Sequence, residues 1–102
     1  MEGKIIKRSS FESTLNDAYR FVLDTGQSVE LVLDSVDVSE PHAEDYECFS
    51  LLFSGPKKDF LEQKMYQVTH GKLGDFLVFI VPVGESEEKI RYEAVFNRKK
   101  AE

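Results

Sequence analysis

Hydrophobic and polar residues alternate with a period of two through much of the chain. Residues 18–23 and 29–34 both alternate, and the segment between them contains Gly26. A glycine at that point supplies the positive φ that a tight hairpin turn needs. Two alternating runs around a short glycine-containing turn predict an antiparallel β-hairpin.

The same period recurs in three later segments. Residues 48–53 place Phe49, Leu51 and Phe53 on one face, and residues 65–70 and 89–97 alternate in the same way. Gly55-Pro56 is expected to end the first of these strands, because proline lacks the amide proton that a ladder needs.

Residues 76–81 differ, since every position from Phe76 to Val81 is apolar. A strand with that pattern is typically covered on both faces, so we predict a central strand here. Pro82 and Gly84 are expected to end its pairing.

The segments between the strands carry other signals. Asp37 to Glu47 contains Pro41 and a cluster of acids, which predicts an exposed loop. Residues 57–63 lack a period of two and are expected to include one or two helical turns.

One N-terminal segment, Ser9 to Asp17, has a helical pattern. Glu12 lies three residues after Ser9, so a capping box starts the predicted helix after Ser9. Phe11 and Leu15 have the (i, i+4) spacing to pack on the sheet, which would make the segment a plug over one end. Asn16 is expected to be a left-handed turn residue.

Six strands at fairly regular spacing predict an all-β fold, a single antiparallel barrel or sandwich with a short N-terminal helical segment. The 102 residues are near the usual size of one domain, so we expect a single β domain over 1–102 with an ordered core of about 10–98.

Charge and cysteine content narrow the function classes. The formal net charge of −6 argues against a nucleic-acid partner. The lone Cys48 cannot form an intramolecular disulfide, so a reducing cytoplasm is expected. The apolar N-terminal run is too short for a secretory signal, and residues 76–83 are too short for a membrane helix, so no membrane partner is expected. Basic residues gather at both ends of the chain and could form a patch if the ends meet: Lys4, Lys7, Arg8, Arg98, Lys99 and Lys100.

Residues able to perform chemistry are few. The scattered glycines form no phosphate-binding loop, and one cysteine with two separated histidines gives no zinc spacing, so no cofactor is expected. The acids of 37–47 could supply oxygen ligands to calcium, but their spacing is not that of an EF-hand, and a solvated connector is the preferred interpretation.

Three polar residues form the candidate site: Gln63, Tyr66 and His70. Tyr66 and His70 share the inward face of one predicted strand, where a polar group must find a hydrogen-bond partner. Imidazole could act as a base, but a strand-end histidine that binds a neighbouring turn is the preferred interpretation. The three side chains are expected to connect the segment 55–63 to the sheet.

The second half of the chain resembles a family of small, uncharacterised microbial domains of unknown function. The resemblance is carried by residues 49–56, by the positions Leu61, Gln63, Tyr66, His70 and Leu73-Gly74, and by residues 79–84 and 92–97. Residues 11–21 are similar too, with Asn16 where a glycine is typical of the family. The resemblance implies a compact all-β domain without known enzyme activity, and an association with phage-tail or tail-collar components.

We therefore expect a structural or protein-interaction module, not an enzyme, with a protein partner or another copy of itself as its ligand. Such a module needs an exposed strand edge or apolar patch. The alternative is a small-ligand-binding β-barrel, in which the twelve Phe and Tyr side chains would line a cavity instead of filling the core.

Overall fold

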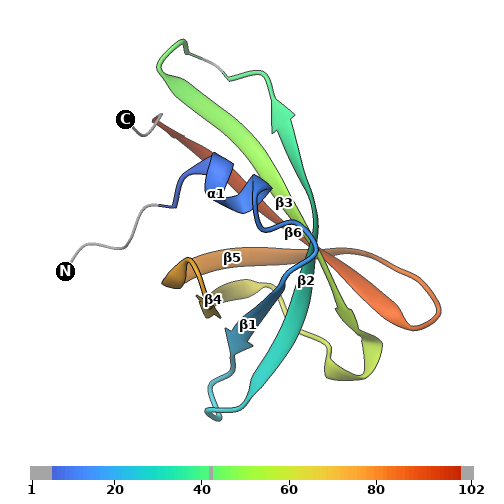
Figure 1. Ribbon diagram of the computed structural model, residues 1–102. Helices are drawn as coiled ribbons and strands as arrows, with labels where there is room; N and C mark the ends of the chain where they lie inside the picture. The colour runs from blue at the N-terminus through green and yellow to red at the C-terminus, as the bar shows by residue number, and fades with distance from the viewer. Residues whose placement is uncertain (1–5, 42, 100–102) are drawn as a thin grey trace.

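The computed structural model describes residues 6–41 and 43–99. The elements are, in chain order, α1 (Arg8–Glu12), β1 (Ala18–Val22), β2 (Ser28–Ser39), β3 (Tyr46–Pro56), the 3₁₀ turn η1 (Lys57–Asp59), β4 (Lys64–His70), β5 (Gly74–Glu85) and β6 (Lys89–Lys99). The strands form one closed barrel in the order β1-β2-β3-β6-β5-β4, and all neighbours are antiparallel (Figure 1). The predicted all-β fold is confirmed, and the barrel is the form that it takes.

The β1–β2 hairpin forms as predicted. Gly26 has a φ of 91°, and its N–H donates to the carbonyl of Leu23. The Leu23 N–H in turn donates to the carbonyl of Gln27, which closes the turn. Glycine adopts this positive φ without the steric cost of a side chain, so the local sequence is sufficient to set the turn.

Two strands are much longer than their alternating runs. β2 continues to Ser39 and β3 begins at Tyr46, so the prediction of an exposed loop over the whole of 37–47 is wrong at both of its ends. β2 accommodates the extension through a register shift between Leu33 and Ser35, which lets the strand bend away from β1.

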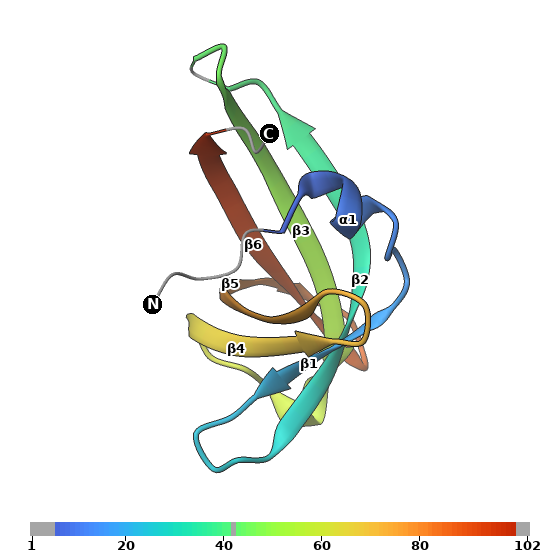
Figure 2. The same cartoon turned by 60° about the vertical axis from the view of Figure 1, so that its left-hand side comes forward.

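The extension creates a three-stranded arm, defined here as residues 35–39 of β2, 46–52 of β3 and 93–99 of β6. The ladder within it is continuous, from Ser35 opposite Leu52 to Tyr46 opposite Lys99. Figure 2 shows the arm rising above the rest of the barrel, with β3 between β2 and β6.

Inward positions of the strands fill the barrel with apolar side chains. Tyr19, Phe21, Phe53 and Tyr92 are completely buried. Phe53 packs edge-to-face with both Tyr19 and Phe21, at centroid distances of 5.4 and 5.3 Å. The alternation predicted for these strands is confirmed: Phe49, Leu51 and Phe53 of β3 are buried together, and so are Tyr66 and His70 of β4.

The prediction that β5 is covered on both faces is wrong. Phe76, Val78 and Ile80 are buried, but Leu77 and Phe79 on the opposite face are 60% and 45% exposed. A barrel wall has one face on the core and one on solvent, so a continuous apolar run does not require two covers.

The predicted end of β5 is also wrong. The strand continues to Glu85, with Pro82 opposite Tyr92 and Gly84 opposite Arg91. A register shift between Pro82 and Gly84 accommodates Pro82, which has no backbone N–H to donate, as is usual for proline in a sheet.

The N-terminal helix exists but is shorter than predicted and starts elsewhere. It spans Arg8–Glu12 with Lys7 as N-cap and no side-chain cap, so the expected Ser9 capping box does not form. Leu15, expected to pack on the sheet, is 40% exposed. Asn16 has a φ of 72°, which confirms its left-handed conformation.

The helix α1 packs onto the strands as the predicted plug, and it does so through Phe11. Its ring is completely buried and contacts Phe49 and Phe96 in the arm at 6.1 and 5.7 Å, and Phe76 of β5 at 5.9 Å. The pairing of β5 with β6 stops where Val81 is opposite Glu93, so the residues before Val81 and those after Glu93 are not paired with each other. Phe11 connects the two strands in this unpaired region.

The connection from β3 to β4 contains the short helical turn expected in 57–63, at η1. Beyond it, the buried Leu61 N–H donates to the Tyr92 hydroxyl at 3.0 Å, which ties the connector to the core. No helix among the described residues is long and apolar enough to cross a membrane.

Candidate functional site

His70 lies at the end of β4, where the strand meets the turn to β5. Its side chain is buried, and Nε2 lies 2.9 Å from Oδ2 of Asp17. On the other side of the ring, Nδ1 accepts the backbone N–H groups of Lys72 at 3.0 Å and Leu73 at 3.3 Å. The predicted role, a strand-end histidine that binds a neighbouring turn, matches this geometry.

These contacts determine the tautomer. Because Nδ1 accepts two N–H groups, the ring proton is on Nε2 and is donated to the Asp17 carboxylate. Neither nitrogen is then available to remove a proton from a substrate. The pair of His70 and Asp17 therefore links β4 to the segment before β1, and its geometry is not that of a general base.

Tyr19 covers the His70 ring and continues the polar network. The two ring centroids are 4.6 Å apart, and the Tyr19 hydroxyl lies 2.5 Å from Oγ1 of Thr14. Thr14 directs its own hydrogen at the carbonyls of Ser10 and Phe11, so Tyr19 is the donor to Thr14. Burial raises the pKa of Tyr19, with a smaller contribution from the nearby Asp17 charge, so the phenol stays protonated at neutral pH.

Tyr66 and Gln63 lie apart from this network. Tyr66 and His70 share the inward face of β4, but four residues of extended strand separate them by about 13 Å. The Tyr66 hydroxyl donates to the carbonyl of Glu62 at 2.8 Å, and burial raises its pKa. Gln63 is exposed. The structure thus does not bring the three candidate residues together, and of the three only Tyr66 bonds to the connector within the described chain.

The acidic hairpin between β2 and β3 offers no assembled cation site in the part of the chain that the structure describes. No group of three or more His, Cys, Asp or Glu side chains comes together there. His42, within the same segment, lies outside the described residues.

A surface hollow lies between the β5–β6 turn and the bulge of β2. Its volume is about 420 Å³, and its walls are polar or glycine: Asp34, Ser54, Gly84, Glu85, Ser86, Lys89 and Arg91. Small-molecule sites are usually apolar with a few convergent polar groups, and this hollow has the opposite composition. The inward aromatic side chains meanwhile fill the core, so no observation favours a ligand inside the barrel.

The outer face of β4 and β5 is the feature that the sequence analysis missed. Met65 is directly opposite Phe79, and Gln67 is opposite Leu77. The exposed fractions of the three apolar side chains are 52% for Met65, 45% for Phe79 and 60% for Leu77. We call Met65, Gln67, Leu77 and Phe79 the β4–β5 face. The continuous apolar run of 76–81 was its signal in the sequence.

The basic ends of the chain do meet. The Arg98 guanidinium donates to the carbonyl of Ile6, which brings Lys7 and Arg8 beside the end of β6. Arg98 also pairs with Glu47 at 3.0 Å and lies over the Phe49 ring. Lys4 and Lys100 lie outside the described residues.

Comparison with known proteins gives one match. A family profile described as a domain of unknown function (DUF6916) matches residues 6–96. No curated protein and no solved structure matches the chain.

Proposed function

We propose that this chain, which belongs to the DUF6916 family, is a non-catalytic structural module that associates with a second copy of itself. The observation that carries the proposal is the β4–β5 face, where three large apolar side chains adjoin one another on solvent. Single exposed apolar residues are ordinary, but a contiguous group on a small domain marks a contact surface.

The absence of charge on this face favours another copy as the occupant. Each chain carries a formal net charge of −6, so two copies repel one another over most orientations. Met65, Gln67, Leu77 and Phe79 are all uncharged, and β1 continues the row with Val22, which is opposite Gln67. Two such faces can meet about a two-fold axis without placing like charges opposite one another.

The hydrogen bonding of the buried polar groups supports a non-catalytic role. His70 uses both ring nitrogens within the fold, and the Tyr19 and Tyr66 hydroxyls each have an internal partner. Reactive groups in enzymes are held ready for a substrate, whereas these side chains connect one element to another.

Sedimentation equilibrium over a wide protein concentration tests the proposal. The unaltered chain is expected to form a dimer, and Leu77→Glu is expected to weaken the dimer at least about tenfold by placing a charge in the contact. Phe60→Glu is the matched control, because Phe60 is 57% exposed on the connector and does not belong to the β4–β5 face. A monomeric chain, or equal effects of the two substitutions, would contradict the proposal.

We further propose that the module acts in a phage-tail-like assembly in a microbial cytoplasm. The family resemblance supports the assembly, and the lone Cys48 supports the reducing compartment. Immunogold electron microscopy of tail-like particles from the cells that encode the chain tests this setting. Label along the particles is expected, and unlabelled particles would contradict it.

A further inference from the structure

The arm has two strand edges that lack a neighbouring strand among the described residues. On β2, pairing with β1 ends at Val32, and the last backbone contacts beyond it join Leu33 to Asn16 and Asp17. On β6, pairing with β5 ends at Glu93. Residues 35–39 and 94–99 are thus paired on one side only within the described chain, with β3 between them.

Figure 2 shows these edges on opposite sides of the arm; α1 contacts β2, and the backbone hydrogen bonds on that side of β2 end at Leu33. An open edge presents backbone N–H and C=O groups that can extend the sheet with a further strand.

The two edges carry opposite charge. Asp34, Asp37 and Glu40 are exposed along the β2 edge, and none of them forms an ion pair within the described chain. At the end of the β6 edge lies the exposed Lys99, with Lys7 held nearby through the contact between Arg98 and Ile6, whereas Arg98 itself is paired with Glu47. Acidic charges oppose the pairing of two β2 edges with each other, but they favour pairing of a β2 edge with a β6 edge.

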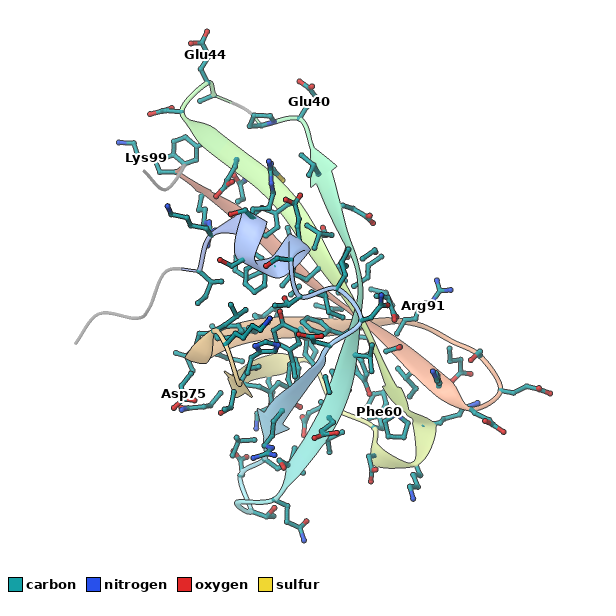
Figure 3. The ribbon with its side chains drawn as sticks, in the orientation of Figure 1. Glu40, Glu44, Phe60, Asp75, Arg91 and Lys99 are labelled. Atoms are coloured by element: carbon teal, nitrogen blue, oxygen red, sulfur yellow. The ribbon has the colours of Figure 1, made fainter. Side chains whose placement is uncertain are left out.

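The acidic residues of the β2 edge and the basic residues of the β6 edge also lie at the same position along the length of the arm. Both outer strands are antiparallel to β3, so β2 and β6 run in the same direction. The register through β3 places Ser39 level with Asn97, and the next residues along the two strands are Glu40 and Arg98. Figure 3 shows Glu40 and Lys99 at the same end of the arm, on its two sides.

We propose that the β2 edge of one copy adds to the β6 edge of the next copy, in parallel, so that the arms of successive copies form one continuous sheet. The contact joins two different surfaces, and it therefore leads to a ring if the rotation closes and to a filament if it does not. It is independent of the β4–β5 face, which joins copies through identical surfaces.

Charge reversal tests this contact by sedimentation velocity at low salt, about 20 mM, where surface charges are least screened. The unaltered chain is expected to form species larger than a dimer, and about 500 mM salt is expected to reduce them. Asp37→Lys with Glu40→Lys is expected to abolish these species, and adding Lys99→Glu to the same chain is expected to restore them. Glu87→Lys with Glu88→Lys makes the same change in net charge at the exposed β5–β6 turn and is expected to leave assembly intact.

The Leu77→Glu background separates this proposal from the proposed dimer. Edge-to-edge assembly is expected to survive Leu77→Glu, because the β4–β5 face takes no part in it. Circular dichroism confirms that each variant is folded. The proposal would be overturned by a chain that never exceeds a dimer at low salt, by equal loss in the Glu87/Glu88 control, or by failure of Lys99→Glu to restore assembly.

Discussion

The strands of the closed part of the barrel and the strands of the arm differ in how many neighbouring strands they pair with. In the closed part, β1 and β4 each have a neighbour on both sides, and their inward side chains reach a common core. In the arm, β2 and β6 each have one neighbouring strand among the residues that the structure describes, and Val38 and Val95 are 58% and 62% exposed. Closure satisfies a strand's hydrogen bonds within one chain, so the open arm is where a second chain can contribute.

Phe11 holds the two regions together, and its removal has the largest expected effect. Phe11→Ala deletes a completely buried ring between β5 and the arm, so the free energy of unfolding is expected to fall by about 3–5 kcal/mol. Chemical denaturation measures the loss, and hydrogen exchange should show that arm amides lose the most protection.

Leu15→Ala is the control for Phe11→Ala. Leu15 follows the same helix but is 40% exposed, so its truncation is expected to change stability by less than about 1 kcal/mol. Similar losses for the two variants would show that Phe11 does not join the arm to the barrel.

Gly55 tests how tightly the closed part is packed. A Cβ at this position would collide with the end of the Leu31 side chain, which is completely buried and would have to shift within the packed core. Gly55→Ala is therefore expected to cost about 1–3 kcal/mol.

Gly71→Ala provides the comparison for Gly55→Ala, because a Cβ at Gly71 meets no atom within 4 Å. Its effect is expected to stay within about 0.5 kcal/mol by thermal or chemical denaturation. If Gly55→Ala were equally harmless, the core near Leu31 would be looser than its burial indicates.

High pH provides the mildest test, and it acts on the closed part. Burial raises the pKa of Tyr19, Tyr66 and Tyr92 in the folded chain above the ordinary value of 10.0. The unfolded chain then loses these protons first, so stability is full below about pH 10 and falls as the pH rises above that value.

Denaturant titrations from pH 8 to pH 11 measure this slope, and phenolate absorbance reports the ionisation of the folded chain. Tyr19→Phe should make the slope shallower, because one of the shifted groups is removed. A slope that is unchanged in Tyr19→Phe would contradict the assignment for that residue.

The candidate site was predicted only in part, for a geometric reason. The position of His70 beside a turn was enough to predict its bonds to backbone N–H groups. Its partner Asp17 is 53 residues away, and only the pairing of β1 with β4 brings them together. The grouping of Gln63 with Tyr66 and His70 relied on nearness in sequence, but a strand separates residues by more than three ångströms at each step.

Local patterns in the sequence were sufficient for the number of strands, for the inward faces of β3 and β4, and for the conformations of Gly26 and Asn16. These properties depend on side-chain alternation and on the φ preference of single residues, which neighbours in sequence determine. Tertiary structure decided that Leu77 and Phe79 face solvent, that β2 and β6 extend into an arm, and that the edges of this arm pair with no further strand of the described chain. Those properties depend on which strand pairs with which. In a closed barrel each strand acquires its neighbours only when the whole chain has folded.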